Sequence, residues 1–188
     1  IGKWLAFTLF KKGYFQKSYN ILNSFKKDVS YSQSEFKLKE QIESHYHLFN
    51  SIPNLDYIRD FQYNTNNQKL MYLISSSRPY NLSGYTIRSH EFIKSLKDQG
   101  VDVSVFTRPG YPWDRSDTSS NTNLNHTSFS SITYNHIKNP SRLNSIDVYW
   151  KQSANELMKR IRHYKISHVM AASDYFNAVP ALIAAKRL

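Results

Sequence analysis

Hydrophobic positions change their spacing along the chain, and this change separates a helical start from a mixed remainder. In residues 1–49 the apolar residues recur every three or four positions, which predicts helices, and Gly13 interrupts the first run. We therefore predict a helical hairpin over residues 1–52, with at most one more helix, over residues 36–49. Residues 53–68 contain proline and several asparagines, and they predict a linker at a domain boundary.

After residue 68, short apolar runs alternate with amphipathic stretches. The expected strands are 69–76, 101–107, 130–137 and 167–173, and the expected helices are 85–99, 146–163 and one that starts near Ala178. Such alternation is typical of a mostly parallel sheet with flanking helices, so residues 69–188 predict a Rossmann-like α/β domain. Residues 115–128 have a turn-forming composition and are expected to be a mobile loop.

Composition excludes several classes of site. None of the 188 residues is cysteine, which excludes disulfides and thiolate metal sites and fits a cytoplasmic location. The longest apolar runs, 4–10 and 178–185, are much shorter than the roughly 20 residues that cross a bilayer. No GxxxxGK[ST] loop occurs, which excludes a P-loop nucleotidase. The chain starts without methionine and stops at AAKRL within a helical pattern, so we expect a fragment.

The formal net charge of +11 predicts attraction to anionic partners. Eight of the lysines fall within the first 39 residues. A solvated helix face explains these lysines, and contact with an anionic membrane surface is the alternative, which would place the protein peripherally at the inner membrane face. Nucleic-acid binding is disfavoured, because no recognition motif surrounds the basic residues.

Three loops follow the carboxyl ends of expected strands, where open parallel sheets bind ligands. The first has a single glycine, Gly84, and Ser83 is the expected cap of the next helix. Gly84 admits close approach of a ligand to the helix amides, which favour an anion, and a tight turn alone also explains it. One glycine does not make a GxGxxG fingerprint, so a dinucleotide site is not expected.

The second loop, RPGYPWDRSD at 108–117, places aromatic rings beside a carboxylate. Rings bind the C–H faces of sugars and acids bind their hydroxyls, so this loop predicts a carbohydrate platform. A rigid turn with its aromatics in the core is the alternative. The candidate binding residues are Arg108, Tyr111, Trp113 and Asp114.

The third loop, SDYFNA at 173–178, follows the last expected strand. Asp174 and Asn177 can reach a ligand from it, although capping of the next helix alone explains Asn177. Pro180 is expected in the first turn of that helix.

Taken together, PYNLSGYTIRSHEFIKSLKDQGVDVSVFTRPGYPWD and HVMAASDYFNAVPALIAAKRL resemble the amino-terminal half of family 4 glycosyltransferases, which have the GT-B fold. The resemblance covers about residues 69–188 and rests on the order and spacing of several motifs. It implies an acceptor-binding domain that faces a donor-binding domain outside this chain. The residues implied to line the site are Ser83, Gly84, Tyr85, Arg88, His90 and Ser173.

Two features qualify individual residues. His90 matches a position in the family's helix and would face a ligand there, and a packing histidine is the alternative. Family members often carry histidines shortly before the serine that aligns with Ser173, where this chain has Met170 and Ala172. No catalytic base is assigned for that reason.

The first hypothesis is therefore the acceptor-binding part of a retaining glycosyltransferase of bacterial polysaccharide synthesis. It would move a sugar from a nucleotide-sugar to a saccharide or lipid-linked acceptor, without metal or further cofactor, and would be inactive without the donor domain. The alternative is a non-catalytic binding module, because the first residues resemble one tetratricopeptide unit. The matching positions are Leu5, Ala6, Leu9, Gly13, Phe15, Ser18, Leu22 and Phe25.

Overall fold

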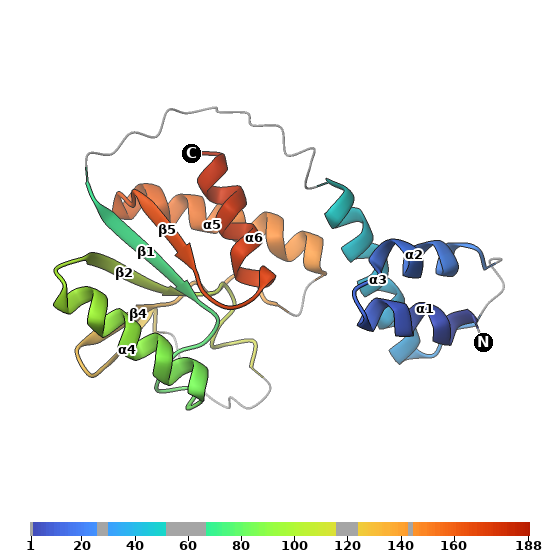
Figure 1. Cartoon of the computed structure of the whole chain (residues 1–188), viewed down its shortest axis with the longest axis horizontal. Coiled ribbons are helices and arrows are strands. Elements are labelled where there is room, and N and C mark those ends of the chain that lie inside the picture. Colours follow the sequence, from blue (N-terminus) through green and yellow to red (C-terminus); the bar gives the residue numbers. More distant parts are fainter. Residues whose placement is uncertain (1, 26–29, 52–66, 116–123, 143–144) are drawn as a thin grey trace. The chain divides into compact units, whose positions relative to one another are not determined.

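The computed structural model describes residues 2–25, 30–51, 67–115, 124–142 and 145–188 (Figure 1). The chain divides into two compact units. The helical unit comprises residues 1–56 and 145–148, and the α/β unit comprises residues 57–144 and 149–188. The division after residue 56 falls inside the predicted linker, most of which lies outside the described residues.

The helical unit contains the predicted hairpin and one further helix. Gly13 separates the first two helices, and its φ of +83° is a conformation that glycine adopts without strain. Ala6, Leu22 and Ile42 form the buried core. Ser18 Oγ donates to the Ala6 carbonyl at 2.7 Å, so small residues lie where the helices meet. The helices are α1 Gly2–Lys11, α2 Phe15–Asn23 and α3 Gln33–Ser51.

The α/β unit is built on a five-stranded sheet in the order β3-β4-β2-β1-β5. β1, β2, β4 and β5 pair in parallel, and β3 adds to one edge in antiparallel orientation. The predicted α/β fold with flanking helices is confirmed. The strands are β1 Lys69–Ile74, β2 Asp102–Thr107, β3 His126–Phe129, β4 Ile132–Asn135 and β5 His168–Ala171, and the helices are α4 Gly84–Asp98, α5 Ile146–Tyr164 and α6 Tyr175–Lys186.

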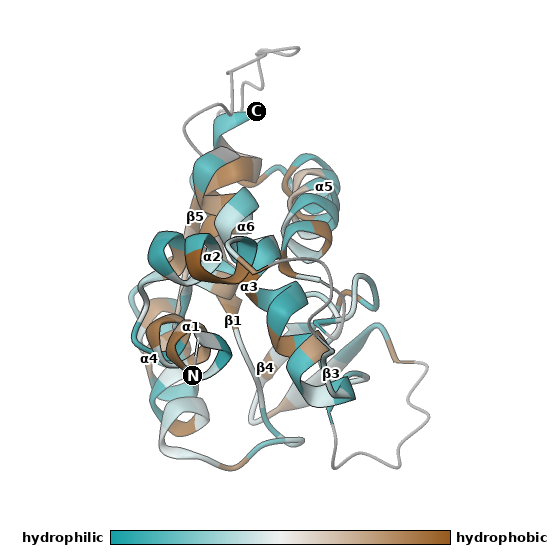
Figure 2. Ribbon diagram, turned by 90° about the vertical axis from the view of Figure 1, so that its right-hand side faces the viewer, coloured by the Kyte–Doolittle hydropathy of each residue, from teal (hydrophilic) through white to brown (hydrophobic). Residues whose placement is uncertain are grey.

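Alternating side chains of the sheet build a core on each face. In β1, Met71 and Leu73 pack with residues of α5 and α6, whereas Tyr72 and Ile74 pack with Ile93 of α4. This period of two explains why the strand reads as a continuous apolar run, since both of its faces are covered. In Figure 2 the ribbon of α5 changes between brown and teal along its length, as expected of a helix with one buried face.

The prediction of a loop over residues 115–128 is wrong for its last three residues, which belong to a strand. His126–Phe129 form β3, and a two-residue turn joins this strand to β4. Ser130 and Ser131 have φ of 45° and 63°, as in a type I′ hairpin turn. The usual Asn-Gly signal of that turn is absent, so the sequence did not reveal it. Residues 116–123 of the predicted loop lie outside the described residues.

No helix in the described ranges combines the length and hydrophobicity needed to span a bilayer.

Candidate functional site

Strands lie on both sides of β1 in the sheet. The chain passes from β1 through α4 to β2 and β4 on one side, and it returns through α5 to β5 on the other side of β1. The helices that follow β1 and β5, which are α4 and α6, cover opposite faces of the sheet. In open α/β sheets, ligands usually bind at the carboxyl ends of two neighbouring strands whose following helices cover opposite faces of the sheet. Here those strands are β1 and β5.

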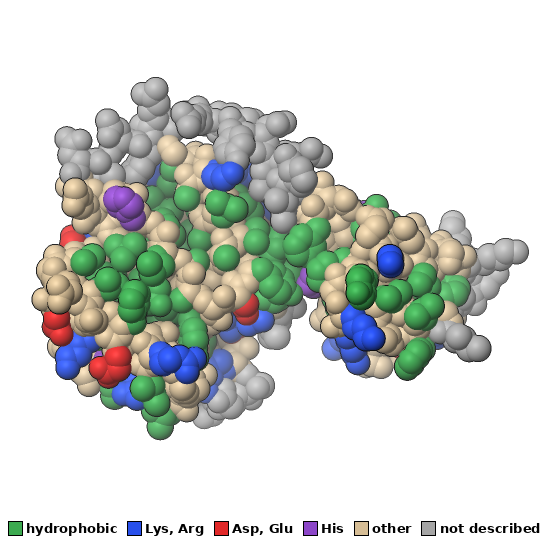
Figure 3. Space-filling view, in the orientation of Figure 1, with side chains coloured by type: hydrophobic (Ala, Val, Ile, Leu, Met, Phe, Trp, Pro, Cys, Tyr) green, Lys and Arg blue, Asp and Glu red, His purple; other side chains and the backbone are tan. Residues whose placement is uncertain are grey.

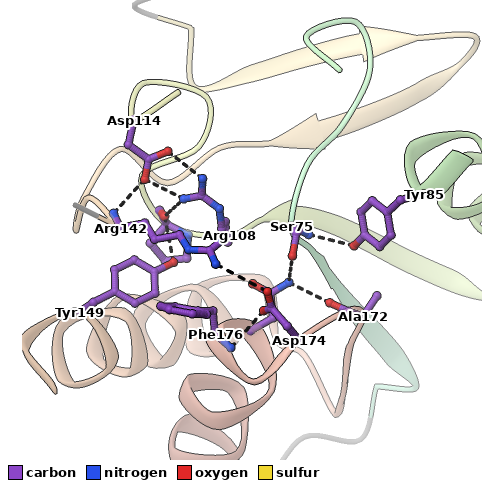
Figure 4. A network of polar contacts seen from close by, with 11 residues as sticks. Ser75, Tyr85, Arg108, Asp114, Arg142, Tyr149, Ala172, Asp174 and Phe176 are labelled. Atoms are coloured by element: carbon purple, nitrogen blue, oxygen red, sulfur yellow. Dashed lines mark hydrogen bonds and ion pairs between the residues drawn. The ribbon is translucent and has the colours of Figure 1, made fainter. Parts of the chain in front are cut away.

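Asn177 ties the ends of β1 and β5 together. Its Nδ2 donates to Ser75 Oγ and to the Ala172 carbonyl oxygen, both at 2.8 Å, and the Ser75 N–H donates to Tyr85 Oη at 2.9 Å (Figure 4). The carbonyl partner fixes which end of the amide is the nitrogen. Asn177 is 1% exposed, yet its Oδ1 has no donor among the described residues. A buried acceptor without a protein donor at this position needs another donor, such as an ordered water or a ligand hydroxyl.

The cap of α6 differs from the prediction. Asp174, rather than Asn177, is the N-cap, and its Oδ1 accepts the Phe176 N–H at 3.0 Å. Because the helix begins at Tyr175, Pro180 lies in its second turn. Because Asp174 caps the helix, the Asn177 side chain can instead donate to the residues that follow β1 and β5.

Ser173 is exposed and has a φ of +88°, a region that residues with a side chain rarely adopt. Such backbone strain costs on the order of 1–3 kcal/mol and is concentrated at functional sites. Ser173 lies shortly after β5 and next to the Asp174 cap, so its unusual backbone lies at the same carboxyl ends of the strands as Asn177 Oδ1, which has no donor in the described part of the chain.

Arg142 is a residue of this edge that the sequence analysis missed. Its guanidinium lies 3.9 Å from the ring centroid of Phe176, and its Nη2 lies 3.7 Å from Asp174 Oδ2 (Figure 4). The side chains of Arg142 and Asp174 are each 38% exposed, so both can still bind a ligand. Arg142 belongs to the loop that follows β4, and this loop lies after the carboxyl end of a parallel strand as the other candidate loops do.

Arg108 and Asp114 form a buried ion pair. Arg108 Nη1 and Nη2 donate to the two carboxylate oxygens of Asp114 at 2.7 and 2.8 Å, and the Arg142 N–H donates to Asp114 Oδ2 at 2.8 Å. The side chains of Arg108 and Asp114 are 9% and 2% exposed. Burial alone would lower the pKa of Arg108, but the hydrogen-bonded carboxylate outweighs it and holds the pKa above its ordinary value. Both charges are satisfied internally.

The carbohydrate platform predicted for this loop is not formed by Tyr111 and Asp114. Tyr111 is 2% exposed, and its hydroxyl donates to the Ser77 carbonyl at 2.9 Å. Burial raises the pKa of Tyr111, which keeps the phenol protonated. Trp113 is half-buried and makes an edge contact with the ring of His136. Tyr111 therefore lies in the core, as the alternative interpretation expects, whereas Trp113 is only partly buried.

The start of α4 has the predicted cap. Ser83 Oγ accepts the Thr86 N–H at 3.3 Å, and the Ser83 N–H donates to Thr86 Oγ1 at 3.0 Å, which makes a capping box. A Cβ added at Gly84 would meet only Arg88 Nη1, the mobile end of an exposed side chain, at 3.3 Å. The described fold therefore gives no steric reason for glycine at this exposed position.

His90 packs inside the α/β unit. It is 3% exposed, its Nδ1 lies 2.6 Å from Tyr134 Oη, and its ring meets the edge of Phe129. Burial lowers the pKa of His90 and raises that of Tyr134 to about 12, so both rings are neutral near pH 7. His90 joins α4 to β4 and is not placed to face a ligand.

Among the described residues, no group of three His, Cys, Asp or Glu side chains gathers in a way that could hold a metal ion. Comparisons with family models, with curated proteins and with solved structures find no match to this chain.

The residues at the sheet edge are of two kinds. Arg108, Tyr111 and Asp114 are buried, and their polar groups are paired within the protein. Asp174 and Arg142 keep partly exposed charged groups, and Asn177 has a buried oxygen without a donor among the described residues. Carboxylate and amide oxygens accept hydrogen bonds from hydroxyls, and a guanidinium donates to hydroxyl or phosphate oxygens. This combination suits a neutral, hydroxyl-rich ligand with an anionic group nearby.

Proposed function

We propose that the α/β unit is the acceptor-binding domain of a retaining glycosyltransferase that uses a nucleotide-sugar donor. The observation that carries the proposal is the Oδ1 of buried Asn177, which has no donor among the described residues and lies at the carboxyl ends of the neighbouring strands β1 and β5. A sugar hydroxyl supplies the missing donor, and the exposed atoms of Asp174 and Arg142 add partners of both signs.

The start of α4 supports the binding of a phosphate group of the substrate. Its first amides and the positive end of its dipole attract a phosphate, and Gly84 lets that phosphate approach the backbone. Donor binding and the catalytic groups are assigned to a second domain, as the resemblance to family 4 glycosyltransferases implies. The acceptor would be a saccharide or a lipid-linked saccharide of bacterial polysaccharide synthesis.

The first test compares the complete gene product with the 188-residue chain. With a panel of nucleotide-sugars and saccharide acceptors, the complete product is expected to release nucleotide, whereas the chain alone is expected to bind acceptor without turnover. If neither form binds or consumes a sugar substrate, a non-catalytic binding module replaces the transferase.

Substituting Gly84 gives the sharper variant test, because the fold has room for a side chain there. Gly84→Ala and Gly84→Val are expected to change the free energy of unfolding by no more than about 0.5 kcal/mol, as exposed positions usually do. In the complete gene product, catalytic efficiency should fall progressively with the size of the side chain at position 84. Lys94→Ala, an exposed substitution further along α4, serves as the control and should leave both quantities unchanged.

We further propose that the helical unit binds an anionic membrane surface, which would bring the domain to a lipid-linked acceptor. Trp4 and Leu5 are 71% and 42% exposed on α1, and Lys11 and Lys12 are exposed at its end. Residues 2–25 contain no Asp or Glu. Figure 3 shows hydrophobic and basic side chains next to each other on this unit. A surface with both hydrophobic and basic side chains suits the interface of an anionic bilayer.

Vesicle flotation tests the membrane proposal. Binding to vesicles with phosphatidylglycerol is expected, with little binding to neutral phosphatidylcholine. Because each lysine near such a surface contributes about 1 kcal/mol, the double variant Lys11→Gln/Lys12→Gln should bind about tenfold or more weakly. The control Lys94→Gln/Lys97→Gln removes the same charge from α4. Equal binding to both lipids, or equal losses in the two double variants, would contradict the proposal.

A further inference from the structure

A polar pocket lies between α5 and the outer strands, beside the carboxyl ends of β2 and β4. It has a volume of about 200 Å³ and is lined by residues of β2, β3, β4 and the last turns of α5. This is below the roughly 300 Å³ at which pockets for drug-sized ligands begin, so it suits a small group. None of the residues that carry the proposed acceptor site lines it.

Arg160 supplies a charge to this pocket that the described residues do not neutralise. Its Nε is buried and has no hydrogen-bond acceptor among them. Glu156, one turn earlier on α5, pairs with Lys159 instead. A guanidinium remains charged at any physiological pH, and a buried donor without an acceptor is costly. The pocket therefore favours an anionic occupant.

The other lining groups add donors and no negative charge. Asn125, His126 and Tyr164 each bring a side chain that can donate a hydrogen bond, and no described Asp or Glu lines the pocket. His136 closes one wall, with both ring nitrogens 2.9 Å from threonine hydroxyls, of Thr107 and Thr127. Because these bonds occupy its nitrogens, His136 shapes the pocket and Arg160 gives it its charge.

We propose that this pocket binds a phosphate group, with Arg160 as its principal ligand and Asn125, His126 and Tyr164 as further donors. The planar fork of an arginine matches phosphate oxygens in pairs, which gives the site both charge and geometry. Free phosphate and a small phosphomonoester present the same chemistry to these groups. The inference does not rest on the proposed transferase activity, because it concerns different residues.

The test uses the 188-residue chain and follows backbone amide signals by NMR while inorganic phosphate is added at constant ionic strength. Saturable shifts are expected at Asn125, His126 and Tyr164 in the unsubstituted protein. Shifts that scatter over the lysine-rich helical unit, or that do not saturate, would overturn the proposal. A parallel titration with glycerol 3-phosphate distinguishes the two sources, because tighter binding of the ester assigns the site to a phosphomonoester.

The variant Arg160→Met should weaken phosphate binding about tenfold or more, as the loss of a charged hydrogen bond implies. Lys151→Met removes a positive charge from an exposed position of the same helix and should bind phosphate as the unsubstituted chain does. Equal binding by Arg160→Met and the unsubstituted chain would refute the assignment. If Arg160→Met does not fold, the signal shifts of the unsubstituted protein decide the question by themselves.

Discussion

Asp114→Ala is expected to lower the free energy of unfolding by about 3–5 kcal/mol, the usual cost of removing one partner from a buried ion pair. The substitution would leave the Arg108 guanidinium, with a side chain 9% exposed, without its carboxylate. It would also remove the acceptor of the Arg142 N–H. The loop after β2 and the loop after β4 would both lose an anchor, so the loss should extend to ligand binding at the sheet edge.

Urea denaturation of matched variants measures this effect. Asp102→Ala is the control, because its carboxylate pairs with Lys69 at 3.7 Å but is 64% exposed, and such pairs contribute at most about 1 kcal/mol. The double variant Arg108→Met/Asp114→Leu should be more stable than Asp114→Ala, since it removes both buried charges together. If Asp114→Ala and Asp102→Ala lose equal stability, the buried pair is not the support that its geometry indicates.

Sequence reasoning found the fold because each buried strand carries its own local signal. The apolar run of β1 and the periodic helix α4 are continuous in sequence, and Ser83 and Gly100 mark the ends of that helix. The position of β3 was not found, because its turn uses two serines in place of glycine or asparagine. Local propensity was weak there, and pairing with β4 decided the structure.

The site was harder to predict because its decisive contacts join residues far apart in sequence. Asp174 and Asn177 are both residue types that cap helices, and sequence alone does not choose between them. The choice depends on a hydrogen bond from Asn177 to Ser75, which lies 102 positions earlier. Likewise, whether Asp114 faces a ligand or the interior depends on Arg108, and burial is not visible in the loop's composition.

His136 is expected to make the free energy of unfolding depend on pH between about 6.5 and 4. In the folded chain it is 5% exposed, and burial, together with the nearby His126, lowers its pKa from 6.5 to about 4. The unfolded chain therefore binds a proton as the pH falls through 6.5, while the folded chain does so only near 4. The contribution to stability is fully present above 6.5, and about 3 kcal/mol of it is lost by pH 4.

Urea unfolding at a series of pH values tests this linkage, with His136→Gln as the informative variant. Its free energy of unfolding should be lower at pH 7, because the imidazole contacts to Thr107 and Thr127 are changed. Its decrease between pH 6.5 and 4 should be smaller by about 3 kcal/mol, since glutamine does not titrate. His168→Gln, at an exposed position of β5, should keep the original slope. An unchanged slope in His136→Gln would show that His136 is protonated as readily in the folded chain as in the unfolded one.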